Sequence, residues 1–493
     1  MEKNEKISYA DDEVINQKPS VSKYLKYLLF FGPGAVLASM TIGQGQLIIG
    51  PQIGAWAGYG LIWLITINVA SYIFCYLGTR FTVLTGLSLM DIVAFKSKGG
   101  WFNWLIVVIM LVFIPVFTAT IITTTGQSLA WIFFGSSQLG VYLPLGIGAC
   151  LLVVFLIFFF KYSFLENVQA FFVVVLAIGS IISAVMALSS VANFDVISFL
   201  SGYFNFGNIP SYPDWVITNF PDTTTTSESL LTLGMLGTLT ISIIPLVGYL
   251  SWAKVKRWGI FHDVKDPAQF EEERFQDFKK SNTITYLPED QHQVKKAKKL
   301  LKPLQIDLTI AFVIVAIVSS CYLICGHLLL GPQPDGSYIF PAGMDLIEAQ
   351  AVIFTSLASW LLPLYQISVF FAFFGTMYAG FEAASRMLHE TTKHIVPRIG
   401  AMEYRKFMAY LVLYILVLGI PISLLIYKGL SFLLVLSITL LFIGVVCVAI
   451  WGGAVIYLSQ KMLPKPYRLK TIGVVIAIIA LLMFISPFFA MLL

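Results

Sequence analysis

Residues 32–46 read GPGAVLASMTIGQGQ and lie within the first long apolar stretch of the chain. A glycine inside a helix costs about 1 kcal/mol relative to alanine, and a glutamine amide is expensive to bury in hydrocarbon. The group Gly43-Gln44-Gly45-Gln46 therefore has two interpretations. It is an unwound segment that lines a cavity, because irregular backbone is tolerated within a membrane only there, or it is a helix whose small residues pack closely against a neighbouring helix.

The sixth apolar stretch of the chain, at residues 230–252, is interrupted in a similar way. Polar, proline and glycine residues lie at its middle: Thr238, Thr240, Ser242, Pro245 and Gly248. Interrupted helices at corresponding positions of two repeats are the best sequence indication of a transporter's substrate site. The first and sixth stretches each open one half of a five-plus-five arrangement, and this correspondence favours the unwound interpretation.

The composition of the chain is that of a membrane protein. Hydrophobic residues make up 58% of the 493 residues and charged residues only 12%, against about 25% charged in an ordinary soluble protein. The apolar residues form long runs, and about 20 such residues in a helix cross the hydrocarbon of a bilayer. We therefore predict an all-α polytopic membrane protein. The five cysteines also lie in apolar stretches, which indicates small buried side chains rather than disulfides or metal ligands.

Eleven apolar segments are interpreted as transmembrane helices. They cover residues 25–49, 55–79, 101–124, 142–160, 168–188, 230–252, 308–330, 353–381, 407–427, 430–458 and 471–492. All but one of the 31 lysines and arginines then fall on the side of the N-terminus, and Lys428 alone falls on the other. By the positive-inside rule this asymmetry predicts a cytoplasmic N-terminus and an extracellular C-terminus in the cell (inner) membrane of a prokaryote. The net charge of +5 belongs to these loops, so no nucleic-acid partner is predicted.

The predicted organisation has five parts. They are a cytoplasmic segment at 1–24, the first five-helix repeat at 25–190, an extracellular loop at 191–228, the second five-helix repeat at 229–458, and the eleventh helix at 459–493. The extracellular loop has no basic residue and several prolines, which indicates an ordered cap. Within the second repeat, residues 254–303 are dense in both charges. A solvated cytoplasmic connector explains them better than a regulatory or partner-binding element does.

The first two apolar stretches resemble those of a known family. The matching residues run without gaps from Gly32-Pro33-Gly34 through Gly45, Gln52, Gly54-Ala55 and Gly58-Tyr59 to Trp63. Looser matches follow at Arg80, Thr85-Gly86, Tyr162, Glu166 and Ile306-Asp307, and in span 6 at Pro245, Tyr249-Leu250, Ala253 and Val255. The pattern is similar to that of the NRAMP (natural resistance-associated macrophage protein) metal transporters. The resemblance implies a leucine-transporter (LeuT-type) fold, which is a five-plus-five inverted repeat with 11 transmembrane helices, and proton-coupled uptake of divalent metals.

The chain departs from this family where the family binds its metal. The Asp-Pro-Gly-Asn motif of span 1, the acidic pair of span 3, and the methionine and histidine of span 6 are all replaced. In that order, the residues here are Gly43-Gln44-Gly45-Gln46, Thr120, Thr123, Ile244 and Leu246. A site for manganese or iron needs carboxylate and thioether ligands, and the aligned positions supply neither. We therefore predict a divergent member with no metal site and no cofactor.

The central site is expected to be neutral and polar. We expect the substrate to contact Gly43, Gln44, Gly45, Gln46, Thr120, Thr123, Ser242, Ile244, Pro245 and Tyr249. Helix N-termini near Gly45 would offer free N–H groups to a carboxylate or another anionic group. The charged residues Glu166, Asp307, Glu382 and Arg386 lie at the cytoplasmic ends of spans. Because Glu382 and Arg386 are four residues apart on one helix, we expect them to pair.

Three functions fit this description. The leading hypothesis is a secondary transporter of the NRAMP-like group, which moves a small solute with a coupling ion across the lipid bilayer by alternating access. The second is a carrier of a small organic solute, an amino acid or a carboxylate, on the same fold. The third is a sensor or scaffold that does not transport. An ATP-driven pump and an enzyme are disfavoured, because the chain has no Gly-x-x-x-x-Gly-Lys-[Ser/Thr] loop and no grouped base and nucleophile.

Overall fold

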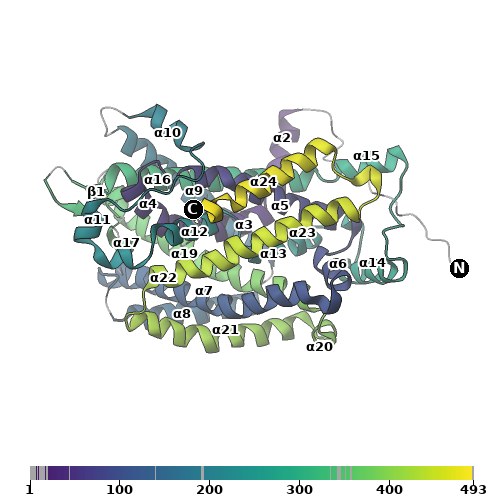
Figure 1. Cartoon of the computed structure of the whole chain (residues 1–493). Coiled ribbons are helices and arrows are strands. Elements are labelled where there is room, and N and C mark those ends of the chain that lie inside the picture. The colour runs from purple at the N-terminus through teal and green to yellow at the C-terminus, as the bar shows by residue number, and fades with distance from the viewer. Residues whose placement is uncertain are drawn as a thin grey trace.

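The structure is a computed structural model and is almost entirely helical. It describes residues 20–43, 45–138, 140–160, 162–189, 194–333, 335–340, 346–349, 351–355 and 358–490, together with Ile7, Tyr9 and Gln17. Figure 1 shows the long helices running side by side as one bundle, with the shorter helices gathered at its two ends.

The first half of the chain begins with a broken helix. Its pieces are α2 (Val21–Tyr27), η1 (Leu28–Phe30), α3 (Pro33–Thr41), η2 (Gly45–Ile49) and α4 (Gly50–Ala57). The other helices of this half are α5 (Trp63–Thr85), α6 (Leu89–Lys96), α7 (Trp101–Phe134), α8 (Tyr142–Phe159) and α9 (Tyr162–Ser189).

The second half repeats this plan, and its first long helix is again in two pieces. These pieces are α12 (Glu228–Leu239) and α13 (Ile243–Val255). They are followed by α16 (Lys302–Leu329), α19 (Leu362–Thr392), α21 (Tyr404–Tyr427), α22 (Phe432–Leu440), η8 (Leu441–Val446), α23 (Cys447–Lys461) and the last helix, α24 (Thr471–Ala490).

Short elements connect the long helices. They are η3 (Lys98–Gly100), α10 (Val196–Gly202), α11 (Asp214–Asn219), η4 (Pro221–Thr225), η5 (Gly259–Phe261), α14 (Pro267–Ser281), α15 (Gln291–Lys299), α17 (Leu346–Ala349), α18 (Val352–Thr355), η7 (Ser359–Leu361), α20 (Pro397–Gly400) and η9 (Lys465–Tyr467). Strands β1 (Gly331–Pro332) and β2 (Tyr338–Ile339) pair as a small antiparallel hairpin.

In the part of the chain that the structure describes, ten helical segments are long and apolar enough to cross a membrane. They coincide with ten of the eleven predicted spans, and the remaining one is the broken first helix. Two predicted boundaries are wrong. The first span continues to Ala57, and Gly58 ends it with a φ of 55° that favours glycine, so the second span begins at Trp63. The eighth span, expected at 353–381, is α19 and lies about three helical turns further along the chain.

The broken helices lie at the centre of the bundle. Helix α16 packs against α3, α4, α5 and α9, while α12 packs against α22 and η8, and α13 packs against α19. The region 254–303 folds into α14 and α15, whose apolar faces bury Phe275, Phe278 and Val294 against the bundle. Tyr286, between these two helices, donates its hydroxyl to the carbonyl of Thr85, 2.8 Å away. The region is therefore a folded layer on the end of the bundle that carries α6, α14 and α15.

Candidate functional site

The two broken helices meet at a central cavity of about 50 Å³, which has room for a few water molecules or a group of similar size. Helices α7 and α19 and the segment η8 complete its wall. Its polar lining consists of Thr41, Thr118, Thr238, Thr240 and Ser242, and its sulfur-bearing lining of Met40 and Met377. Among the described residues that line the cavity, none is ionisable.

The first break requires glycine because side chains of neighbouring helices approach its backbone closely. Helix α3 ends at Thr41, Gly43 lies in a turn, and the chain resumes its winding at Gly45 as a segment of π-helix. A Cβ atom added at Gly45 would overlap the side chain of Thr238, and one added at Gly43 would overlap the hydroxyl of Thr376. The glycines therefore let two neighbouring helices contact the backbone of the broken segment directly.

The second break lies at Thr240–Ser242, where α12 has ended and α13 has not begun. The hydroxyl of Thr240 is used internally, since it donates to the carbonyl of Leu236 at 2.7 Å. Ser242 precedes α13 without a capping side-chain hydrogen bond. The first N–H groups of a helix have no partner within it and carry a partial positive charge. The predicted interruptions of spans 1 and 6 are thus present. The second is confined to Thr240–Ser242, so Pro245 and Gly248 lie within α13.

The predicted site residues fall into two groups. Gly45, Ser242, Ile244 and Pro245 line the central cavity. The residues that do not line it are Gly43, Gln46, Thr120, Thr123 and Tyr249, and Gln44 lies outside the described residues. Gln46 accepts a hydrogen bond from Ser319 on α16, and its amide nitrogen has no partner among the described residues.

Helix rotation explains why the two threonines of α7 do not reach the cavity. Thr120 donates to the carbonyl of Phe117 at 2.8 Å, and Thr123 donates to that of Ala119 at 3.0 Å. Thr118 and Ile121 of the same helix line the cavity instead. Each residue turns an α-helix by about 100°, so an alignment displaced by one or two positions selects another face.

The thioethers of Met40 and Met377 were missed by sequence reasoning, which considered only the positions aligned with the family's ligands. Met40 lies three positions before the first break, so its place could have been inferred from the end of α3. Met377 lies on α19 and carries no local signal, because only the packing of α19 against α3 and α13 brings it to the cavity. The lining is therefore uncharged. It combines apolar side chains and hydroxyl groups with two soft thioether sulfurs.

A buried carboxylate ties the start of α3 to α13 and α16. Asp307 is fully buried and accepts hydrogen bonds from the N–H of Gly32 at 2.8 Å and from that of Gly34 at 2.7 Å. The hydroxyl of Tyr249 on α13 donates to the same carboxylate. Three donors from two other elements thus converge on one side chain at the base of the first broken helix.

Two further ion pairs lie near this point. The ammonium of Lys256 is 2.6 Å from a carboxylate oxygen of Glu166, so the end of α13 is held to the start of α9. The predicted pair of Glu382 and Arg386 on α19 is confirmed. Glu382 also accepts from the indole N–H of Trp252 at 3.0 Å, which joins α19 to α13.

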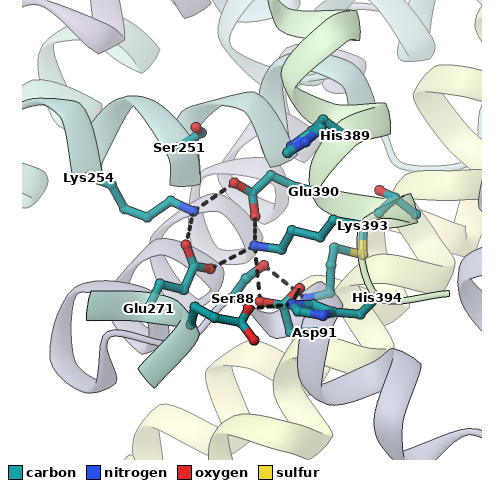
Figure 2. Close-up of polar contacts among 12 residues, drawn as sticks. Ser88, Asp91, Ser251, Lys254, Glu271, His389, Glu390, Lys393 and His394 are labelled. Atoms are coloured by element: carbon teal, nitrogen blue, oxygen red, sulfur yellow. Dashed lines mark hydrogen bonds and ion pairs between the residues drawn. The ribbon is translucent and has the colours of Figure 1, made fainter. Parts of the chain in front are cut away.

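A buried network of charges closes the same end of the bundle (Figure 2). The carboxylates of Asp91, Glu271 and Glu390 have oxygens within 4.8 Å of one another, a spacing that a metal ion could bridge. Figure 2 shows the ammonium of Lys393 among them. Its nitrogen is 3.2 Å from an oxygen of Asp91, 3.2 Å from one of Glu271 and 2.9 Å from one of Glu390. Lys254 adds contacts of 2.6 Å to Glu271 and 2.8 Å to Glu390. The lysines already occupy the position of a cation, so this arrangement is a structural ion-pair network.

The environment shifts the pKa values of these groups. Burial acts to raise the pKa of Asp91, but Lys393 and His394 more than offset it and the pKa is lowered. Burial raises the pKa of Glu271, and the nearby Glu390 adds to the shift. For Lys393 burial disfavours the charge, yet the surrounding carboxylates raise its pKa well above the ordinary value.

A cavity of about 910 Å³ opens beside this network, between α13, α14 and α19.

Known proteins resemble this chain in structure and not in sequence. No protein-family model and no curated protein sequence matches it. A manganese transporter from Eremococcus coleocola, solved in complex with an aromatic bis-isothiourea substituted compound, is 12% identical and superposes with a TM-score of 0.64, over 96% of this chain and 88% of that one. Mhp1, a nucleobase-cation-symport-1 family transporter solved closed with bromovinylhydantoin bound, is 13% identical, with a TM-score of 0.52 over 94% and 90%.

The chain has the leucine-transporter fold. The fold class predicted from the sequence is thereby confirmed, including its two five-helix repeats and the broken helix that opens each. In this fold, ten apolar helices and the broken first helix make the chain an integral membrane protein. At identities of 12% and 13% the likeness extends to the fold and not to the substrate.

Proposed function

We propose that this chain is a secondary transporter that carries a small solute across the membrane by alternating access, and that the solute binds at the central cavity. The observation that carries the proposal is that both breaks contribute to the lining of one cavity, the first through Gly45 and the second through Thr240 and Ser242. Unwound backbone in two corresponding helices offers N–H and carbonyl groups to a ligand at the middle of a membrane. A sensor or scaffold would gain nothing from this arrangement, which costs backbone hydrogen bonds.

The lining favours a small organic solute with little net charge. A divalent metal needs negative ligands to offset the loss of its water, and the described lining is neutral. A carboxylate of the solute would be stabilised by the N-terminus of α13, and the threonine and serine hydroxyls suit an amino or amide group. Transition-metal transport is the second candidate. The specific observation in its favour is the pair of thioethers from Met40 and Met377, because thioethers prefer soft metals.

In this proposal, the contacts of Asp307 stabilise one state of the alternating-access cycle. We place the end of the bundle that carries α6, α14 and α15 in the cytoplasm, because the basic loops lie there. Opening the cavity on that side requires α3 to move away from α13. The carboxylate of Asp307 holds both helices, and the pair of Lys256 and Glu166 holds α13 to α9. These contacts stabilise the arrangement in which the cytoplasmic side is closed.

Uptake by proteoliposomes tests the proposed function. The panel pairs manganese and iron with amino acids and small carboxylates, each with and without a proton or sodium gradient. We expect saturable uptake of an organic solute that Gly45→Ala abolishes, because the added methyl group overlaps Thr238. Gly179→Ala is the matched control, since a Cβ atom at Gly179 meets no other atom within 4 Å. If only metals are taken up, the result would support metal transport in place of transport of an organic solute. If the folded protein takes up none of the solutes, transport would be refuted.

A further inference from the structure

The cavity between α13, α14 and α19 is large enough to hold a small molecule, and we refer to it as the outer cavity. Its volume of about 910 Å³ compares with about 300–1,000 Å³ for ordinary ligand sites. Its inner wall is buried, with exposed fractions of 6% for Ser251, 6% for Lys254 and 4% for Glu271. Its edge includes the exposed residues Arg257 and Asp266. The outer cavity therefore opens to the surface and narrows to a buried wall.

The carboxylates that line the outer cavity already have partners. They are Asp266, Glu271, Glu272 and Glu390. Glu271 and Glu390 are both held by Lys254 and Lys393. Asp266 accepts from the N–H groups of Ala268 and Gln269 at 3.0 and 3.1 Å. Glu272 accepts from the side-chain amide of Gln276 at 2.6 Å. A cationic ligand would therefore compete with existing contacts at each of them.

Arg257 differs from the other charged residues of this lining. Lys254 and Lys393 are paired as described, and Arg386 is paired with Glu382. The guanidinium of Arg257 is exposed at the edge of the cavity and forms no ion pair with any residue that the structure describes. A guanidinium binds a carboxylate or a phosphate through two parallel N–H bonds. The charge without a partner is thus positive and suits an anion.

The backbone of Arg257 gives independent support for a role of its side chain. Arg257 follows α13 and has a φ of 55°, in the left-handed region. The N–H of Trp258 donates to the carbonyl of Ala253 at 3.1 Å, which closes a helix-ending turn where glycine is the usual residue. The conformation is unfavourable for a residue with a Cβ atom. Strain of this kind is found mainly at functional sites, where a particular side chain is needed.

The wall formed by α19 and α21 is aromatic. His389 and Tyr404 line the outer cavity, with their ring centroids 5.5 Å apart. The Nε2 of His389 is buried and has no hydrogen-bond partner among the described residues. Figure 2 shows this imidazole apart from the ion pairs of the neighbouring Glu390. The wall thus offers ring surface to the organic part of a ligand.

We propose that the outer cavity binds a small organic anion. Its carboxylate or phosphate group would pair with Arg257, and its organic part would lie against His389 and Tyr404. A bound ligand would connect α13, α14 and α19, because these helices form the cavity. The site is separate from the central cavity and does not depend on the solute that is carried. A phosphate group can come from a soluble molecule or from a phospholipid headgroup, and the test distinguishes these sources.

Calorimetric titration of the full-length chain in neutral detergent at low salt tests the proposal. The anionic probes are succinate, glycerol phosphate and dihexanoylphosphatidylglycerol, and the comparison probes without net charge are glycerol and dihexanoylphosphatidylcholine. We expect an anionic probe to bind at least tenfold more tightly than its comparison probe. Binding of succinate or glycerol phosphate would indicate a soluble ligand, and binding of the short-chain lipid alone would indicate a headgroup site. If none of the three anions binds, the proposal is overturned.

Variants of Arg257 separate its side chain from the fold. Arg257→Gly removes the guanidinium and relieves the left-handed backbone, so it should keep or raise the melting temperature and still weaken binding at least tenfold. Arg257→Lys keeps the charge without the paired N–H groups and should have an intermediate affinity. Arg398→Gly is the matched control, because Arg398 is exposed on α20 beside the cavity and does not line it. Unchanged binding by Arg257→Gly would refute the assignment, and so would an equal loss in Arg398→Gly.

Discussion

Replacing Asp307 by asparagine should loosen the base of the first broken helix. The carboxylate accepts from the N–H groups of Gly32 and Gly34 and from the hydroxyl of Tyr249. An asparagine side chain has nearly the same shape, so it should not create a cavity or a clash. It replaces one oxygen by an NH₂ group, however, and a donor would then face another donor in a fully buried position.

The size of the effect follows from the bonds that are lost. A hydrogen bond to a charged group contributes about 1.5–3 kcal/mol, and leaving a buried donor unsatisfied costs about 1–3 kcal/mol more. Losing at least one of the two N–H bonds therefore weakens the closed arrangement by about 3–5 kcal/mol. At about 1.4 kcal/mol for each factor of ten, opening on the cytoplasmic side should become at least 100-fold more frequent. Tyr249→Phe removes a single hydroxyl and should have a smaller effect, of about tenfold.

Cysteine labelling measures this opening. Ala384 lines the central cavity on α19, and Ala384→Cys provides a single reporter because the five native cysteines are buried. In inside-out vesicles, an impermeant maleimide should label the reporter at least 100-fold faster when Asp307→Asn is also present. Asp290→Asn is the matched control, since it removes a carboxylate that caps α15 far from α3 in sequence. An unchanged labelling rate together with an unchanged melting temperature would show that Asp307 does not hold α3.

Four further outcomes are expected. Cysteines introduced at Ser227 and Ser281 should be labelled from opposite sides of the membrane, and labelling of both from one side would overturn the predicted span count. Thr238→Gly should restore part of the uptake lost in Gly45→Ala, because it removes the side chain that the new methyl group overlaps; a double variant as inactive as the single one would show another cause. Lys393→Met should cost about 3–5 kcal/mol of unfolding free energy. Because Lys393 lowers the pKa of Asp91, the unmodified protein gains stability from that carboxylate above its pKa and loses it as the pH falls through the pKa; this acid-linked loss should be smaller in the variant, and melting temperatures across pH 3–8 check this. Calorimetry should find manganese binding no tighter than low millimolar, whereas micromolar binding would contradict the neutral site.

The membrane-spanning plan of this protein could be predicted from its sequence. Insertion into a bilayer depends on the local density of apolar residues, and that density is readable along the chain without knowledge of neighbours. The breaks in spans 1 and 6 were also predictable, because glycine, proline and hydroxyl residues weaken a helix wherever they occur. The predicted span boundaries near α4 and α19 were wrong, because composition does not show where a helix begins or ends. A helix end is set by a single backbone conformation, such as that of Gly58, which composition does not reveal.

Several residues around the cavity were decided only by the tertiary structure. Thr118 and not Thr120 reaches it, because packing sets the rotation of α7, and Met377 arrives from a helix that is distant in sequence. Asp307 acquires three donors only when α3, α13 and α16 meet. The same is true of Lys393, whose carboxylate partners come from α6, α14 and its own helix. Apolar content acts on each helix separately, whereas directional polar contacts depend on the relative positions of several helices, and those positions exist only in the folded chain.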